Sequence, residues 1–215
     1  MRNREELTVR KELLLLCAAA LALSSCDFST KGDKIGTYKN PKRALLVLDV
    51  QKDFTSDSAR MPIDRSQVVP LIRNINSLIT DSQGKGDLVI YIRNVFHRPD
   101  VANLFRHYAA IEGSPGVAFD DRLLMVSDRV FDKSQPDAFS NKGLESFLVA
   151  NQVGEITVCG VFADQCVYWT SRGALSRGYN VNYAVDAVGA GSARDISRAA
   201  ASIEKYGARL VTSKN

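Results

Sequence analysis

The sequence predicts a three-layer α/β/α domain built on a mainly parallel sheet. Short apolar runs alternate along the chain with longer segments whose apolar residues recur at helical spacing. The first apolar run, residues 43–48 (RALLVL), is nearly continuous, as is typical of a parallel strand that is covered on both faces. Strands that are separated by helices favour this fold class. A length of 215 residues, with 45% hydrophobic and 24% charged residues, indicates one globular domain.

The first half of the domain is predicted to contain a strand, a long helix and two further strands. After residues 43–48, apolar positions spaced by three or four residues predict a helix, which Gly84 and Gly86 stop. Residues 88–92 read as the second strand. An irregular stretch through Pro99 and Pro115 then leads to a short strand that ends near Lys133. The apolar positions of the helix are Val68, Leu71, Ile72, Ile75, Leu78 and Ile79.

The second half repeats the alternation more regularly. The predicted elements are a helix over residues 141–151, a strand over 156–159, a helix that begins after Cys166 and ends near Gly178, a strand over 181–185, a helix over 192–206 and a strand over 209–211. The sequence shows no internal repeat and no second domain.

The charge pattern argues against a nucleic acid as partner. The formal net charge of +4 is spread along the chain, and no run of five or more Lys or Arg occurs. Basic residues are not interleaved with aromatic ones, as they are in many proteins that bind nucleic acids.

The amino terminus differs from the rest of the chain. Residues 1–12 carry four basic and three acidic side chains, and the apolar run LLLLCAAALALSS then ends in small residues directly before Cys26. This run suits the core of a signal peptide better than a bilayer span of about 20 residues. Residues 23–26 (LSSC) resemble the bacterial lipobox, in which the cysteine is diacylated and becomes the first mature residue. An ordinary cleaved signal peptide and a simple membrane anchor are the alternatives.

We therefore expect residues 1–25 to be a lipoprotein signal peptide and residues 26–41 to be the lipidated Cys26 with a flexible tether. Residues 42–215 would form the folded domain. The tether segment is rich in Lys, Gly, Ser and Thr, and two acyl chains anchor a protein firmly. Asp27 resembles an inner-membrane retention signal of enterobacterial lipoproteins. The expected location is that of an exported, membrane-anchored lipoprotein, on the periplasmic face of the inner membrane in a Gram-negative bacterium.

Two of the four cysteines remain for the folded domain. Cys17 lies in the signal peptide and Cys26 at the lipobox, which leaves Cys159 and Cys166. Their spacing does not suggest a zinc site, which needs paired cysteine or histidine ligands. Cys159 ends a strand-like run, where a small buried residue is expected.

Polar residues follow three of the predicted strands. In such sheets ligands bind beyond the carboxyl ends of the strands. Asp49 ends the first strand, Lys133 follows the third and Cys166 follows the fourth, so an acid, an amine and a thiol would meet at one edge. Taken singly, they also suit a loop-capping acid, a solvated lysine and a small buried residue.

Together these three groups form a set that can attack a carbonyl carbon. A neighbouring ammonium and the amino terminus of a helix both lower the pKa of a thiol, so we expect a lowered pKa for Cys166. A carboxylate can take the thiol proton and pass it to a leaving amine. We expect the Cys166 Sγ atom within about 5 Å of both the Asp49 carboxylate and the Lys133 amine.

Three motifs carry a family resemblance. DVQKDF around Asp49, FDKSQPDAF around Lys133, and GVFADQCV with the later ALSRGY and DAV segments resemble the isochorismatase-like cysteine hydrolases. This superfamily includes nicotinamidases and N-carbamoylsarcosine amidase, and the resemblance covers about residues 43–211. It implies a six-stranded parallel sheet and a catalytic triad of Asp49, Lys133 and Cys166. It also implies an oxyanion hole made by the backbone amides of Phe162 and Cys166, and a cis peptide between Val161 and Phe162.

Two departures from the family pattern refine the predicted chemistry. Isochorismatases of siderophore pathways resemble this chain but often lack the cysteine, so Cys166 points to amide or carbamoyl hydrolysis. Nicotinamidases carry a metal site built from an Asp-x-His pattern and further histidines, whereas this chain has only His97 and His107. We therefore expect no metal and no other cofactor.

The sequence thus predicts a lipid-anchored cysteine hydrolase that cleaves a small amide, carbamoyl or ureido compound through a thioester on Cys166. Lys133 would hold the thiolate and the carboxylate in their charged forms. The expected partners are a small-molecule substrate, the membrane and further copies of the chain in a homo-oligomer. An isochorismate-type vinyl-ether hydrolase and a non-catalytic, metabolite-binding lipoprotein are the alternatives. The residues expected to line the substrate pocket are Phe54, Phe96, His97 and Phe139.

Overall fold

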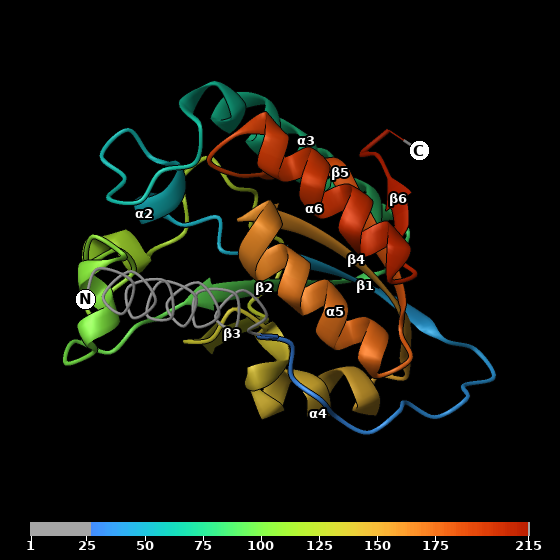
Figure 1. Ribbon diagram of the computed structural model, residues 1–215. Helices are drawn as coiled ribbons and strands as arrows, with labels where there is room; N and C mark the ends of the chain where they lie inside the picture. Colours follow the sequence, from blue (N-terminus) through green and yellow to red (C-terminus); the bar gives the residue numbers. More distant parts are fainter. Residues whose placement is uncertain (1–26, 215) are drawn as a thin grey trace, which may run out of the picture.

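The computed structural model describes residues 27–214, whose strands form a six-stranded, all-parallel sheet (Figure 1). The strand order is β3-β2-β1-β4-β5-β6. Every neighbouring pair is parallel, which confirms the predicted fold class. The strands are β1 (Lys42–Leu48), β2 (Leu88–Asn94), β3 (Val130–Lys133), β4 (Val153–Val161), β5 (Asn180–Gly189) and β6 (Arg209–Val211).

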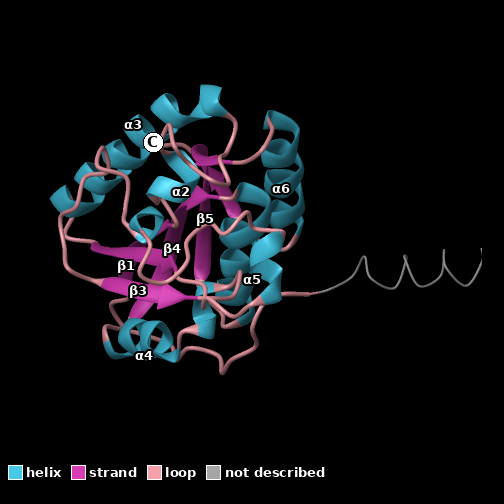
Figure 2. Ribbon diagram, turned by 90° about the vertical axis from the view of Figure 1, so that its left-hand side faces the viewer, coloured by secondary structure: helices cyan, strands magenta, loops and turns pink. Residues whose placement is uncertain are grey.

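Helices cover both faces of this sheet, as Figure 2 shows with α3 to the left of the strands and α5 and α6 to the right. One face packs against α3 (Arg65–Gly84), and the other packs against α4 (Lys142–Ala150), α5 (Tyr168–Ser176) and α6 (Ala193–Lys205). The shorter helices are α2 (Lys52–Thr55), the 3-10 turns η2 (Val101–Leu104), η3 (Pro115–Val117) and η4 (Ala138–Ser140), and the π-helical turn η5 (Ala163–Val167).

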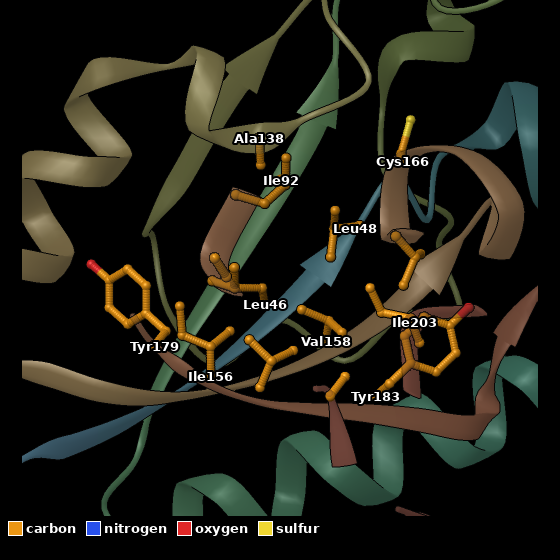
Figure 3. Close-up of a cluster of buried hydrophobic side chains, with 14 of the residues drawn as sticks. Leu46, Leu48, Ile92, Ala138, Ile156, Val158, Cys166, Tyr179, Tyr183 and Ile203 are labelled. Carbon is orange, nitrogen blue, oxygen red and sulfur yellow. The ribbon is translucent and has the colours of Figure 1, made fainter. Parts of the chain in front are cut away.

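The alternation of side chains along β1 produces two separate hydrophobic cores. Leu45 and Val47 pack with the apolar face of α3, whereas Leu46 and Leu48 pack on the opposite face. Figure 3 shows this second core, with Cys166 beyond Leu48 at the carboxyl end of the strands. Because both faces are covered, β1 reads as a continuous apolar run in the sequence.

The predicted elements all occur, but three strands are longer than their apolar runs. β2 continues to Asn94, β4 begins at Val153 and β5 continues to Gly189. The register between β4 and β5 shifts between Val158 and Gly160, and pairing resumes with Val188 and Gly189. The end of β5 could not be predicted from the sequence, because Asp186 and the small residues around it interrupt the apolar pattern by which strands are recognised.

The segment expected to be a flexible tether lies against the domain. Residues 27–41 contain little regular secondary structure, but the Thr30 backbone N–H and Oγ1 donate to Asp137 Oδ2 at 2.6 and 2.7 Å. The Ile35 N–H donates to the Arg177 carbonyl at 2.8 Å. Polar contacts that the sequence pattern does not reveal therefore bind this segment to the fold.

The predicted signal peptide and Cys26 lie outside the described residues. Within residues 27–214, no helix combines the length and the hydropathy that crossing a bilayer requires.

Candidate active site

Four buried polar side chains meet at the carboxyl edge of the sheet. Asp49 follows β1, Asn94 ends β2, Lys133 ends β3 and Cys166 lies in η5, directly after β4. Asp49 is completely buried, and the other three expose less than a tenth of their surface. The order of the strands brings together residues that are far apart in the sequence.

The Lys133 amine is the centre of this cluster. Its Nζ atom lies 2.9 Å from Asp49 Oδ2 and 3.2 Å from Cys166 Sγ. It also donates to Asn94 Oδ1 at 2.9 Å. The thiol is thus within the expected distance of the amine, and the three side chains selected from the sequence share one site.

Asn94 is a member of the cluster that the sequence analysis missed. Its Nδ2 atom donates to Asp49 Oδ2 at 2.9 Å and lies 3.5 Å from Cys166 Sγ. Gln51 holds the Asn94 backbone in place, because its side chain accepts from Asn94 N at 2.8 Å and donates to Asn94 O at 2.9 Å. The same rule that selected the other residues would have found Asn94, since it is the polar residue at the end of the second strand.

The charges of Asp49 and Lys133 compensate each other in this buried site. Burial raises the pKa of the Asp49 carboxyl, against the opposing influence of the Lys133 charge. Burial alone would lower the pKa of Lys133, but the Asp49 charge and the thiol reverse this, and the pKa of the amine is raised. We conclude that the two residues form a buried ammonium–carboxylate pair.

The expectation of a lowered pKa for the Cys166 thiol is wrong. Burial raises this pKa to about 11; Lys133 lowers it, and the Asp49 carboxylate raises it further. The ammonium that would stabilise a thiolate already faces a carboxylate. At neutral pH the site therefore holds a neutral thiol beside the ion pair.

One oxygen of the buried Asp49 carboxylate has no hydrogen-bond partner among the described residues. Oδ2 accepts from Lys133 and Asn94, whereas Oδ1 has no hydrogen-bond partner among the described residues. Interaction with the Cys166 thiol lowers the pKa of this carboxyl, which identifies the thiol as a neighbouring proton donor. Of the two carboxylate oxygens, Oδ1 is therefore the one with free capacity to accept a proton.

The pKa of Cys166 predicts a steep pH dependence of alkylation. Because only the thiolate reacts, the rate of modification of Cys166 by iodoacetamide should rise about tenfold per pH unit between pH 7 and 10. Peptide mapping of the native protein should show slower modification of Cys159, which is completely buried and has a raised pKa. A rate that reaches its plateau near neutral pH would contradict the neutral thiol.

The turn between β4 and α5 carries Cys166. The Val161–Phe162 peptide is cis, as the family resemblance implied. The Phe162 carbonyl accepts from Gln165 N at 3.0 Å and Val167 N at 3.1 Å, which makes the turn tight. Gly160, with a φ of 118°, approaches β1 so closely that a Cβ atom would overlap the Leu48 carbonyl.

A cavity of about 380 Å³ lies beside Lys133. His97 is among its lining residues, as expected, and its Nδ1 atom lies 3.2 Å from Glu112 Oε2. All of its lining residues except Val95 have polar side chains; the set is Val95, His97, Glu112, Asp132, Lys133, Ser134, Gln135, Ser140 and Asn141. It suits a ligand with several hydrogen-bonding groups.

The three phenylalanines expected in the pocket wall occupy other positions. Phe139 has no exposed surface and packs 5.8 Å from the Tyr179 ring, so it belongs to the core and the prediction for it is corrected. Phe54 is buried as well, with its ring 5.6 Å from that of Phe162. Phe96 is half-buried under the Arg106 guanidinium at 4.0 Å. Apolar residues near strand ends fill the core as readily as they line a pocket.

The described residues do not provide the set of metal ligands that nicotinamidases carry. No group of three His, Cys, Asp or Glu side chains with the geometry for a metal ion occurs among residues 27–214. His97 is paired with Glu112.

Comparison with known proteins agrees with this fold and this set of motifs. Residues 43–215 match the family model for the isochorismatase domain. A streptothricin hydrolase from Streptomyces noursei is 31% identical over 146 residues, which cover 66% of this chain and 52% of the relative. This chain thus spans about half the length of that relative.

Two further relatives extend the comparison. An N-carbamoylsarcosine amidase from Arthrobacter sp. is 26% identical over 182 residues, which cover 80% of this chain and 68% of the relative. The crystal structure of a nicotinamidase/pyrazinamidase from Bacillus subtilis superposes with a TM-score of 0.71 at 21% identity and covers 79% of this chain and 99% of that one. From the family match over most of its length, we conclude that this chain belongs to the isochorismatase family.

Proposed function

We propose that this protein is a metal-independent cysteine hydrolase that cleaves a small amide, carbamoyl or ureido compound through a thioester on Cys166. The observation that carries the proposal is the contact of 3.2 Å between Cys166 Sγ and Lys133 Nζ, beside a carboxylate with a free oxygen. The names of the related streptothricin hydrolase and N-carbamoylsarcosine amidase support hydrolysis of a C–N bond.

The first half of the reaction forms the thioester. Cys166 gives its proton to Asp49 Oδ1 as the sulfur attacks the carbonyl carbon, because the pKa of the free thiol is about 11. The amides of Phe162 and Cys166 would hold the negative oxygen of the tetrahedral intermediate. Its collapse breaks the C–N bond, and the proton on Asp49 passes to the leaving ammonia or amine.

The second half restores the enzyme. Asp49 takes a proton from water as the water oxygen attacks the thioester carbon, and the C–S bond then breaks. The sulfur recovers a proton, and a carboxylic or carbamic acid leaves. The Lys133 ammonium contacts both the carboxylate and the sulfur. It can therefore stabilise the negative charge whether that charge resides on the Asp49 oxygen or on the Cys166 sulfur.

A substrate panel tests the proposal directly. Primary amides, N-carbamoyl amino acids and ureides are incubated with the protein, and released ammonia is measured. Ammonia should appear with at least one of these compounds, and a thioester adduct on Cys166 should be found by mass spectrometry after acid quench. Turnover of any of these compounds without an adduct would contradict the thioester mechanism.

Prolonged chelation is expected to leave this activity unchanged. The described residues offer no set of ligands for a catalytic metal, so EDTA or 1,10-phenanthroline should remove nothing that the reaction needs. Ammonia release is measured before and after dialysis against chelator. A loss that added zinc or iron restores would show that the pocket binds a metal after all.

The lipid anchor remains a separate proposal, based on the lipobox-like residues 23–26. We expect the mature protein to begin at an acylated Cys26 and to partition into the membrane fraction. Mass spectrometry of that fraction checks the expectation, and Cys26→Ala should accumulate as an unprocessed, unlipidated precursor. An unmodified Cys26 in the membrane fraction would contradict the anchor.

A further inference from the structure

Residues 27–35 precede the family domain, which begins at residue 43, yet they contact it along their length. We call this segment the strap. We propose that the strap positions the segment that carries Lys133 against the helix that follows Cys166, with Thr30 as the positioning residue. The strap is the blue trace that passes α5 and α4 in Figure 1.

The first contacts of the strap are with α5. The Asp27 carboxylate lies 3.0 Å from Arg172 Nη2, and the Phe28 ring packs edge-on against Trp169 at 5.6 Å. At the other end, Ile35 packs against the hydrophobic core. These contacts fix both ends of the segment.

The middle of the strap supplies partners to two buried charges. Asp137 Oδ2 accepts from the backbone N–H and the hydroxyl of Thr30, while its Oδ1 accepts from Phe139 N at 2.9 Å. Arg177 Nη1 donates to the Thr30 carbonyl at 2.8 Å, and Arg177 Nε donates to Glu145 at 2.7 Å. Both Asp137 and Arg177 are completely buried, and a buried charge without partners is strongly destabilising. The domain alone would thus leave Asp137 Oδ2 without these two donors.

The strap also fits closely over the ion pair of Arg177 and Glu145. A Cβ atom at Gly32 would overlap Glu145 Oε1 and lie 2.5 Å from Arg177 Nε. A side chain at position 32 would therefore require the Glu145 and Arg177 side chains, or the strap itself, to shift. This close approach marks the strap as a packed element of the fold.

Asp137 connects the strap to the active site. It follows Lys133 by four residues and caps η4, whose first residue Ala138 donates its N–H to Thr170 Oγ1 at 3.0 Å. Thr170 belongs to α5, which begins two residues after Cys166. Thr30 thus holds the junction at which the segment from Lys133 meets the helix from Cys166. A looser junction would change the distance between the amine and the thiol.

The test compares Thr30→Val, which removes the hydroxyl that donates to Asp137, with Thr30→Ser, which retains it. Thr80→Val is the matched control, because the Thr80 hydroxyl donates only to the Asn76 carbonyl, on the exposed face of α3. For each full-length protein we would measure the alkylation rate of Cys166 against pH, kcat and KM for a hydrolysed substrate, and the midpoint of thermal unfolding.

Thr30→Val should lower kcat about fivefold or more, on the scale of one lost hydrogen bond to a charged group, and should shift the alkylation profile of Cys166. Thr30→Ser should restore both quantities to within about twofold, and Thr80→Val should change neither. If Thr30→Val lowers only the unfolding midpoint, with kcat and the alkylation profile of the folded protein unchanged, the strap merely stabilises the domain and the proposal fails. The alkylation assay needs no substrate, so its result stands apart from the proposed reaction.

Discussion

Replacing Cys166 by alanine is expected to reduce the hydrolysis of amide or carbamoyl substrates on the order of 10⁴-fold or more in kcat. The proposed thioester needs the sulfur, and Cys159, the other cysteine of the domain, is completely buried and donates to the Leu46 carbonyl. No second thiol of the domain can take over. The measurement is kcat by ammonia release, together with the binding of the substrate to the variant by calorimetry.

The same variant separates the three functions that the sequence leaves open. A vinyl-ether hydrolase would retain its activity, since it needs no covalent sulfur intermediate, and that result would overturn the proposed mechanism. A non-catalytic binding protein would show unchanged affinity in the variant and no turnover in the wild type. Because Cys166 is small and is 8% exposed, its replacement by alanine removes only one buried atom and should not unfold the protein. Thermal unfolding of both proteins checks this.

The position of the site could be predicted because a parallel sheet has one functional edge. Asp49, Lys133 and Cys166 are the polar residues at three strand ends, and strand ends are readable from apolar runs. The sequence analysis missed Asn94 because the apolar run of β2 ends at Ile92, two residues before the strand itself ends. An error of two residues at a strand end, which is ordinary for sequence patterns, was enough to hide a residue that contacts the other three side chains.

The protonation state of the site depends on facts that the sequence does not contain. The sequence predicts that an amine and the start of a helix lie near the thiol, and both favour a thiolate. It does not show that burial opposes ionisation, or that Asp49 shares the Lys133 ammonium. The neutral thiol results from these two effects together.

Side-chain packing explains two further differences between the sequence-based predictions and the structure. Phe139 was selected because it lies close to Lys133 in the chain, whereas its ring packs in the core beside Tyr179. The strap has the composition of a linker, but Thr30 and Gly32 match buried groups on the domain. Composition predicts flexibility only where the fold offers no partner.

Asp49→Asn is expected to reduce kcat by about 10²- to 10⁴-fold, because the amide cannot accept the thiol proton or pass it to the leaving amine. The backbone should not change, since the φ of 56° at this position lies in the left-handed region that Asp and Asn both tolerate. The same variant should speed the alkylation of Cys166 at neutral pH. The Asp49 charge raises the pKa of the thiol and Lys133 lowers it, so removing the carboxylate leaves the ammonium to stabilise the thiolate.

These two changes in opposite directions distinguish a proton-transfer role of Asp49 from a merely structural one. A loosened or partly unfolded site would lose turnover and would expose Cys159 as well, whereas loss of the base alone leaves Cys159 unreactive and makes Cys166 more reactive. Asp81→Asn is the matched control, because Asp81 lies on the exposed face of α3 and pairs there with Lys85. It should leave kcat and both alkylation rates unchanged. If Asp49→Asn retains more than about a tenth of the wild-type kcat, some other group takes the thiol proton, and the free Oδ1 atom is not the base.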